Sequence, residues 1–357
     1  MSKKSVKLSV LAAIFISLVY LATDRVWPAI KYHAFPRPRP ALLHELQHPS
    51  PTQNNLTVNL VVASTAEDDI SWTDKLYSRI PNLTVLRYVS DSQTSGLHPP
   101  VAKGREALMY FTYLHDFYDH LPDISIFVHA EETPWHLEGT LLQNTSFALS
   151  QLDLMRVVVE RRGYFNLRVT WRAACPAWID TRKTFENWEK QEEPYMPQAW
   201  AANFDDPVPD ILAGPCCSQF VVSRTAIQRR PREQYERSMK WLVETSWSDQ
   251  IVGRVWEHMW PWLFKSEAKD CAPERESLCR MYSVCFEDDR QLEAYKELWE
   301  ERERLKEKVS FLRASWAPRT ATEARKKMDE VGDEIERQLS RAWEDGRASK
   351  AEAGSLR

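Results

Sequence analysis

The residues best suited to chemistry lie in one short segment, His129 to His136, which contains two imidazoles, two carboxylates and an indole. The adjacent carboxylates of Glu131 and Glu132 are hard oxygen ligands of the kind that hold Mg²⁺ or Mn²⁺. We assign His129 to the same metal shell, His136 to general-base catalysis, and Trp135 to stacking on a sugar ring. The alternative is structural: His129 ends a strand, and the two glutamates cap the following helix.

Three residues elsewhere in the chain extend this hypothetical site. Lys103 and Arg105 occupy a loop-to-helix junction, where backbone amides and side-chain cations favour an anionic ligand such as a phosphate. Asp249 stands near the start of a late helix and could accept the proton of an attacking hydroxyl group. Each has a structural alternative, because Arg105 can pair with Glu106 at the surface and Asp249 can cap its helix.

Composition and motifs exclude several other classes of protein. The net charge is −4, from 47 basic and 51 acidic side chains, so no basic excess points to a nucleic-acid partner. The chain lacks GxGxxG, GxxxxGK[ST], GxSxG and CxxC patterns, and with them the commonest nucleotide-loop and serine-hydrolase signatures. Apolar residues make up 43% and charged residues 27%, which is ordinary for a globular protein with a core.

The amino terminus carries a membrane-insertion signal. Lysines in residues 1–7 precede the uncharged run 8–23, which as a helix would be about 24 Å long. That length is slightly short for a ~30 Å hydrocarbon core and suits the thinner membranes of the early secretory pathway. We predict a cytoplasmic tail at 1–7 and an uncleaved signal anchor at 8–23, giving a single-pass type II membrane protein of the ER or Golgi. The alternative is a cleaved signal peptide and a secreted protein, although Tyr20 fits poorly at position −3 of a cut after Ala22.

The residues beyond the apolar run agree with a lumenal location. Dense prolines predict an extended stem at 24–56. Sequons for N-glycosylation occur at Asn55, Asn82 and Asn144. Six cysteines follow, an even number that permits three disulfides in fifteen complete pairings. Because neighbouring cysteines do not easily bridge to each other, we expect Cys216 and Cys217 each to pair with a distant cysteine.

Strands and helices alternate in the region that must position these residues. Apolar runs predict strands at 58–64, 83–89, 123–129, 163–169 and 214–222. Helices are expected at 107–119, 231–241 and 249–264. This alternation predicts an α/β domain at 57–286, with a mainly parallel sheet and helices on both faces. Ligands of such sheets bind beyond the carboxyl ends of the strands, where the segment beginning at His129 falls. On the last helix, the three-residue spacing of Arg254 and Glu257 favours an ion pair over a site.

The carboxy-terminal part, 287–357, differs in composition. Charged residues dominate 287–313, and the apolar residues there follow coiled-coil spacing over about three heptads. Pro318 stops this helix, and Thr320 to Glu323 resembles a capping box that starts a second one. We predict a helical hairpin with a tail, which packs on the body of the protein or serves as a surface for a protein partner at 287–343.

Several motifs occur in a recognisable order. They are Glu67-Asp-Asp-Ile-Ser-Trp72, Lys103-Gly-Arg-Glu-Ala107, Asp123-Ile-Ser-Ile-Phe-Val-His129 with Trp135-His136, Gly163-Tyr-Phe-Asn-Leu-Arg168 with Cys175-Pro176, Gly214-Pro-Cys-Cys-Ser-Gln-Phe-Val-Val-Ser-Arg224, and Gly253-Arg254-Val255 after Asp249. Together, over about residues 58–286, they resemble a fungal family known as domain of unknown function 3431. The resemblance implies a type II membrane or secreted protein with a layout similar to that of nucleotide-sugar glycosyltransferases.

Two positions depart from those patterns. The sugar-transferase layout usually places an Asp-x-Asp metal motif after a strand, where this chain has His129-Ala-Glu131-Glu132. Family members also tend to carry a histidine after the tryptophan that matches Trp260, where this chain has Pro261. If either position is catalytic, the activity of this chain is altered.

These observations predict a glycosyltransferase-A-like, metal-dependent enzyme that moves a sugar from a nucleotide donor to an acceptor. Glu131 and Glu132 would hold the divalent cation, Arg105 would face phosphate, and Asp249 would activate the acceptor hydroxyl. One alternative is a non-catalytic, membrane-anchored accessory protein whose helical hairpin binds a partner. Another is a tailoring protein of fungal secondary metabolism.

Overall fold

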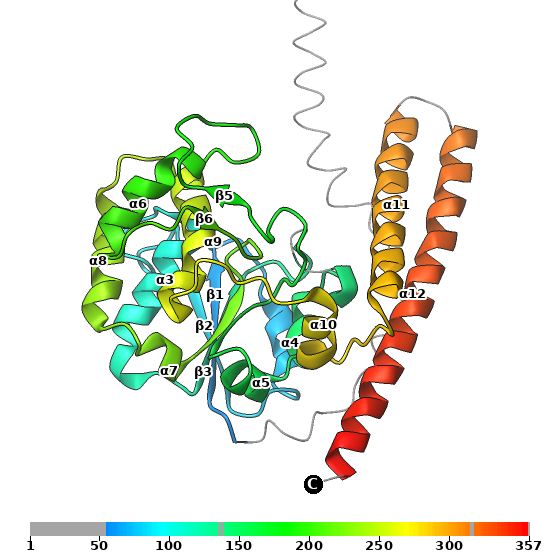
Figure 1. The fold of residues 1–357 in the computed structure, drawn as a ribbon, viewed down its shortest axis with the longest axis horizontal. Coiled ribbons are helices and arrows are strands. Elements are labelled where there is room, and N and C mark those ends of the chain that lie inside the picture. Colours follow the sequence, from blue (N-terminus) through cyan, green and yellow to red (C-terminus); the bar gives the residue numbers. More distant parts are fainter. Residues whose placement is uncertain (1–54, 135–136, 138, 315–317, 356–357) are drawn as a thin grey trace, which may run out of the picture. The chain divides into compact units, whose positions relative to one another are not determined.

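The computed structural model of the chain describes residues 55–134, 137, 139–314 and 318–355 (Figure 1). The predicted cytoplasmic tail, the signal anchor at 8–23 and nearly all of the stem lie outside these residues. So do two predicted site residues, Trp135 and His136. Within the described residues, no helix combines the length and apolar character needed to cross a membrane.

A five-stranded sheet in the order β2-β1-β3-β7-β4 forms the centre of the domain. Its strands are β1 (Val58–Ser64), β2 (Leu83–Val89), β3 (Ile124–His129), β4 (Tyr164–Asn166) and β7 (Phe220–Ser223). β1 pairs in parallel with β2 and β3, whereas β7 is antiparallel to both β3 and β4. The mostly parallel sheet predicted from the sequence is therefore confirmed, with β7 as the reversed strand. β7 is reversed because the segment 167–219 leaves β4 and re-enters the sheet at the same edge.

The order of the strands reverses direction at β1. The chain passes from β1 to β2 on one side and then returns to β3 on the other side of β1. The connections that follow β1 and β3 therefore leave in opposite directions. Open α/β sheets generally bind ligands beyond the carboxyl ends of the two strands at which this reversal occurs. β1 is buried along nearly its whole length, as expected for a strand covered on both faces.

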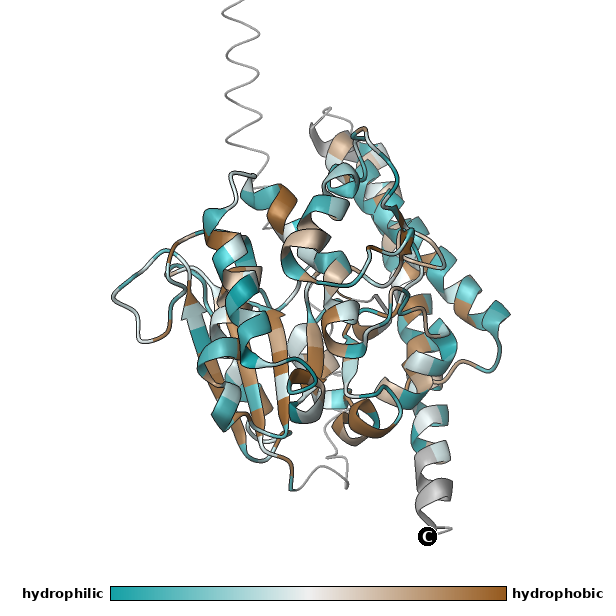
Figure 2. Cartoon of the chain, turned by 60° about the vertical axis from the view of Figure 1, so that its left-hand side comes forward, coloured by the Kyte–Doolittle hydropathy of each residue, from teal (hydrophilic) through white to brown (hydrophobic). Residues whose placement is uncertain are grey.

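Helices cover both faces of the sheet (Figure 1). The α-helices of the domain are α3 (Arg105–Asp116), α4 (Thr145–Gln151), α5 (Leu154–Val159), α6 (Met196–Asn203), α7 (Arg224–Ile227), α8 (Arg232–Glu244), α9 (Asp249–Lys265) and α10 (Glu274–Tyr282). Short 3₁₀ turns are η1 (Ser71–Leu76), η2 (Tyr118–His120), η3 (Gly139–Leu141) and η4 (Glu193–Tyr195), and a two-stranded sheet joins β5 (Ile179–Asp180) to β6 (Ile211–Leu212). Apolar residues follow the strands, and polar residues cover the outer helix faces (Figure 2).

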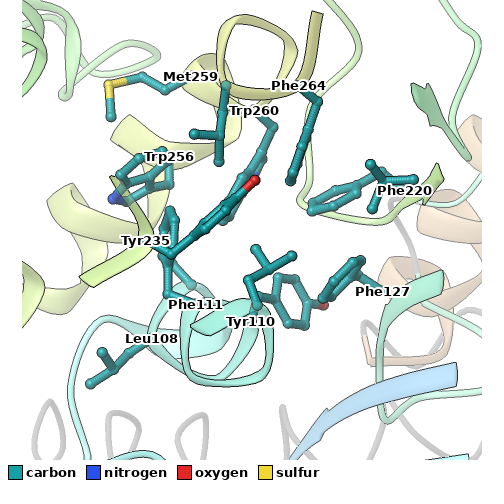
Figure 3. Close-up of a cluster of buried hydrophobic side chains, with 14 of the residues drawn as sticks. Leu108, Tyr110, Phe111, Phe127, Phe220, Tyr235, Trp256, Met259, Trp260 and Phe264 are labelled. Atoms are coloured by element: carbon teal, nitrogen blue, oxygen red, sulfur yellow. The ribbon is translucent and has the colours of Figure 1, made fainter. Parts of the chain in front are cut away.

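An aromatic cluster joins α3 and α9 to the sheet (Figure 3). The Trp260 ring on α9 lies 5.0 Å from the ring of Phe111 on α3 and 5.0 Å from that of Phe220 on β7. Residues 107–114 of α3 are all buried, so this helix is surrounded by protein, as its broad aromatic face predicted. The large apolar area of these rings fixes α9 relative to α3.

Three disulfides form among the described residues: Cys175–Cys271, Cys279–Cys285 and Cys216–Cys217. The expectation that Cys216 and Cys217 pair with distant cysteines is wrong, because they are joined to each other. The backbone at Cys217 and Ser218 is left-handed, with φ of 87° and 48°. Such a turn brings consecutive side chains to the same side, which extended chain does not do.

Two long helices, α11 (Asp289–Ala314) and α12 (Pro318–Ser355), follow the α/β domain. The chain divides into two compact units, and residues 297–335 belong to a different unit from residues 48–296 and 336–357. Within the first, Lys327 Nζ lies 2.7 Å from Glu301 Oε1. Within the second, the Trp343 ring on α12 lies 4.8 Å from that of Phe147 on α4. The end of α12 is thus part of the core of the α/β unit.

Candidate functional site

Two carboxyl groups from distant parts of the chain meet near the carboxyl edge of the sheet. Glu106 lies in the first turn of α3. This helix starts at the carboxyl edge because it connects two parallel strands and runs antiparallel to them. Glu257 lies on α9, one turn after Gly253. A Cβ atom on Gly253 would lie only 3.1 Å from Cδ of Arg105. The small residue therefore lets α9 approach the start of α3, which brings Glu257 near Glu106.

The environment of this carboxyl pair favours its neutral form. Burial raises the pKa of Glu257 to about 7, and the negative charge of Glu106 adds to the effect. Burial also raises the pKa of Glu106. Two interacting carboxyl groups that have lost much of their hydration do not both ionise readily. Near neutral pH the pair can therefore supply a carboxylic acid and a carboxylate that interact electrostatically, the combination used in acid–base catalysis.

The turn at residues 216–218 contacts both members of the pair. The amide of Cys217 donates a hydrogen bond to Oε2 of Glu257 over 3.1 Å. The Ser218 hydroxyl hydrogen-bonds Glu106 and also accepts from Nε1 of Trp260 over 3.0 Å. One tight turn thus positions two side chains that come from different helices.

Two residues predicted as site residues, His129 and Arg105, lie beside each other at this edge. The His129 amide at the end of β3 donates to Oε1 of Gln219 over 3.3 Å. Burial, together with the positive charge of Arg105, lowers the pKa of His129 to about 4. The imidazole is therefore neutral at physiological pH and can act as a hydrogen-bonding partner or ligand. Arg105 itself is exposed, so its guanidinium can reach an anionic ligand.

Lys103 and Asp249 connect helix ends. Lys103 Nζ donates to two carbonyls at the end of α8, those of Val243 (3.1 Å) and Thr245. A cation at a helix carboxyl terminus is electrostatically favourable. The Asp249 carboxylate accepts the Gly104 amide over 2.9 Å, at the start of α3. Both side chains thereby hold α3, α8 and α9 together, and Asp249 caps a different helix from the one that the sequence indicated.

The two adjacent glutamates after β3 have different surroundings. The Glu132 carboxylate is bound by Lys75 Nζ (2.6 Å) and by the Ser146 hydroxyl (2.7 Å). Glu131 is exposed. The ligand atoms of Cys216, Cys217 and Glu257 lie within 4.8 Å of one another. The two sulfurs are bonded to each other, so Glu257 is the one unmodified ligand of this group.

A second buried cluster lies one turn from the pair. The carboxylate of Glu192, which is 1% exposed, contacts Nε of Arg254 (2.8 Å) and Nε2 of His258 (3.0 Å). Burial opposes its ionisation, but the bond from His258 and the nearby positive charges hold the pKa of Glu192 below its usual value. The predicted ion pair of Arg254 with Glu257 is thus corrected: the partner of Arg254 is Glu192. Spacing along the helix indicated that Arg254 is paired but not with which residue.

A hollow of about 440 Å³ lies at the carboxyl ends of β1 and β2. Its lining residues are Ala66, Arg87, Val89, Ser95, Gly96 and Leu97. The Arg87 guanidinium donates to the carbonyls of Thr65 (2.9 Å) and Asp68 (2.8 Å), and thereby holds the loop after β1 in place.

Residues 60–280 match the family model described as "Protein of unknown function (DUF3431)". The chain belongs to this family. No curated protein and no solved structure is significantly similar to the chain. The DUF3431 region contains the carboxyl pair, the turn at 216–218 and the hollow, whereas α11 and α12 lie beyond it. The family membership indicated by the sequence motifs is therefore confirmed.

The sequons of this DUF3431 protein differ in accessibility. Asn55 and Asn82 are exposed. Asn144 is 6% exposed, and its side chain caps α4 by accepting the Phe147 amide over 2.8 Å. A glycan would attach to Nδ2 of Asn144, which donates to Oε1 of Glu132 over 3.4 Å, so Asn144 is the least accessible of the three sequons.

The central pair of Glu106 and Glu257 was not predicted from the sequence, although some signals were present. Glu106 directly follows Arg105 in the Lys103-Gly-Arg-Glu motif, and Cys217-Ser218 lies in a motif that carries the family resemblance. Another pattern was missed altogether. His44-Glu-Leu-Gln-His48 has the HExxH spacing of zinc proteases, which binds zinc only on a helix. It lies outside the described residues.

Proposed function

We propose that the DUF3431 domain transfers a glycosyl group from a nucleotide sugar, and that Glu106 and Glu257 are its acid–base pair. The carboxyl pair carries this proposal, because it combines raised pKa values with a position near the carboxyl edge of an α/β sheet, where such sheets generally bind ligands. In the proposed step, a Glu257 carboxylate accepts the proton of an acceptor hydroxyl. The hydroxyl oxygen bonds to the anomeric carbon, and the bond from that carbon to the nucleoside diphosphate breaks.

Neighbouring groups support a nucleotide donor. Arg105 is exposed beside the pair and suits the phosphates. The hollow next to Arg87 suits the nucleoside, because it lies at the carboxyl ends of β1 and β2. We assign the general base to Glu257 and not to Asp249, because the Asp249 carboxylate already accepts a hydrogen bond from the Gly104 amide.

The divalent cation is still a prediction, and the proposed glycosyl-transfer step does not depend on it. His129, neutral at physiological pH, and the exposed Glu131 are the residues that would hold it and so place positive charge near the phosphates. Glu132 fits such a site poorly, because Lys75 already neutralises its carboxylate. No proton or glycosyl movement proposed here passes through the metal.

The cellular location is part of the same proposal. Residues 8–23 would anchor the protein in the ER or Golgi membrane, with the α/β domain in the lumen. Three disulfides among the described residues support an oxidising compartment.

Nucleotide binding and glycosyl transfer can be tested on the purified protein. Unfolding is followed with a panel of nucleoside diphosphates and Mn²⁺, and transfer with the matching nucleotide sugars. A nucleotide at about 100 times its Kd stabilises the fold by about 2.7 kcal/mol. Glu257→Gln should keep this stabilisation and lose transfer, whereas Asp249→Asn, the matched control, should keep transfer. The absence of both binding and transfer across the panel would reject the proposal.

One observation favours the alternative, a non-catalytic accessory protein. Asp289–Ala314 and Pro318–Ser355 form two long, charged helices beyond the family region, and Phe311 on α11 is 69% exposed. Helices outside the family region are available to a protein partner, and Phe311 gives a residue at which to test one. If the nucleotide panel gives no binding, loss of co-purifying proteins on Phe311→Glu would support this alternative.

A further inference from the structure

The disulfide between Cys216 and Cys217 differs from the other two in what it does for the fold. Cys175–Cys271 joins residues 96 positions apart, and Cys279–Cys285 closes a loop at the end of α10. Disulfides stabilise a protein mainly by closing loops in the unfolded chain, more so for longer loops. Cys216–Cys217 closes no loop beyond its own two residues. Its presence therefore calls for a role other than stabilising the fold.

Two charged groups lie beside this disulfide: the Arg168 guanidinium, which favours a thiolate, and the Glu257 carboxyl group, which has an oxygen within 4.8 Å of both sulfurs and disfavours one when ionised. Arg168 Nη1 lies 3.1 Å from Sγ of Cys216 and 3.5 Å from Sγ of Cys217. A guanidinium at this distance stabilises a sulfur anion and lowers the pKa of a thiol. Cys216 is partly exposed, whereas Cys217 is 9% exposed. A reagent from solvent therefore meets Cys216 first, so Cys217 is the leaving group, and Arg168 lies within 3.5 Å of both sulfurs.

One side chain positions both the arginine and the turn. Asn166 Oδ1 accepts the Arg168 amide over 2.9 Å. Its Nδ2 donates to the carbonyls of Pro215 (2.7 Å) and Cys216 (3.1 Å). Asn166 is buried at the end of β4, so the sheet fixes this arrangement. The guanidinium is therefore held near the sulfurs before any reaction begins.

We propose that Cys216–Cys217 is a thiol-exchange site for low-molecular-weight thiols, with Cys216 as the sulfur attacked. A thiolate bonds to Sγ of Cys216 as the Cys216–Cys217 bond breaks. Its electron pair stays on Cys217, whose thiolate lies beside Arg168 and takes a proton from solvent. A second thiolate then attacks the mixed disulfide, forms a disulfide with the first thiol and releases the thiolate of Cys216. Two thiols are oxidised, and one protein disulfide is reduced.

Thiol exchange at Cys216–Cys217 would change the arrangement of the carboxyl pair. Only this consequence depends on the proposed function. The Cys217 amide and the Ser218 hydroxyl hold Glu257 and Glu106 through the left-handed turn. Opening the disulfide frees the turn to change its backbone angles. A thiol could therefore control the arrangement of the pair.

Peptide mapping tests the site without any activity assay. The full-length protein is treated with reduced glutathione under native conditions, quenched with acid, alkylated and digested. The expected first product is a glutathione adduct on Cys216, with the other two disulfides intact. Adducts that form first on Cys217, on Cys279 or on Cys175 would overturn the proposal, and so would an absence of adducts.

Variants test the role of Arg168. Arg168→Gln should slow adduct formation about tenfold near neutral pH, because the thiolate loses its cation. Arg168→Lys should restore part of the rate. Arg290→Gln, which removes a 94% exposed arginine paired with Asp288, is the control. Equal rates for Arg168→Gln and wild type would contradict the assignment. If the protein binds nucleotide but shows no thiol exchange, only the thiol-exchange site is rejected. If it shows thiol exchange but binds no nucleotide, the thiol-exchange site is supported and only the proposed function is rejected.

Discussion

The two pairs of glutamates near the carboxyl edge of the sheet differ in a way that sequence distance does not predict. Glu131 and Glu132 are adjacent, yet one is exposed and the other is bound by Lys75 and Ser146. Glu106 and Glu257 come from different helices, yet they interact and both have raised pKa values. The comparison teaches that loss of hydration and the nearest charges decide what a carboxyl group can do.

The largest expected effect concerns the aromatic cluster beneath the central pair. Trp260→Ala should lower the free energy of unfolding by about 3–5 kcal/mol, because it leaves a cavity among buried rings. It also removes the Nε1 donor to Ser218. Chemical denaturation would measure the loss. Trp188→Ala, at an 82% exposed position, is the control and should change stability by less than about 0.5 kcal/mol. Similar losses for both variants would contradict this account.

The pH dependence of stability should report on the pair formed by Glu106 and Glu257. The pKa of Glu257 is about 7 in the folded protein and near 4.5 when unfolded. The unfolded state therefore releases its proton first, and this contribution to stability falls as pH rises from about 4.5 to 7. The difference between wild type and Glu257→Gln should change by on the order of 2 kcal/mol over that range.

His129 provides a check on the sign. Its pKa of about 4 lies below the usual 6.5, so its contribution to stability is lost as pH falls through that interval. Since both proteins retain His129, the difference between them reports on Glu257 and the Glu106 carboxyl group coupled to it. A flat difference curve for Glu257→Gln would show that the central pair is not coupled to folding.

Helix α4, whose Ser146 hydroxyl binds Glu132, should lose stability when its amino-terminal cap is removed. Asn144→Ala removes the side chain that accepts the Phe147 amide at the start of α4 and should cost about 1 kcal/mol. Urea denaturation would report it, with Asn55→Ala as an exposed control. A cost equal to that of the control would mean that this cap does not support the segment after β3.

The smallest expected effect is the coupling between Lys75 and Glu132. The Lys75 side chain is 62% exposed, and an exposed ion pair contributes about 0.2–1 kcal/mol. A double-mutant cycle with Lys75→Met and Glu132→Gln would measure the coupling. High salt should reduce it further. A coupling of several kcal/mol would remove the contrast between the two carboxylate regions.

Local sequence signals predicted most of the central elements. The strands expected at 58–64 and 83–89 coincide with β1 and β2, and the helix expected at 249–264 is α9 with one more residue. The strand expected at 214–222 begins later, at Phe220, because only its end lies opposite β3 and β4. Residues 214–219 instead form the turn that holds the carboxyl pair.

By itself, the sequence determined the family, the mostly parallel α/β sheet and the neighbourhood of His129 and Arg105. These properties follow from apolar periodicity and from motifs whose residues are close in the chain. Only the tertiary structure decided that Glu257 meets Glu106, that Arg254 pairs with Glu192, and that Cys216 bonds to Cys217. The physical reason is that desolvation and pairing depend on which distant elements pack together, and no local spacing encodes that.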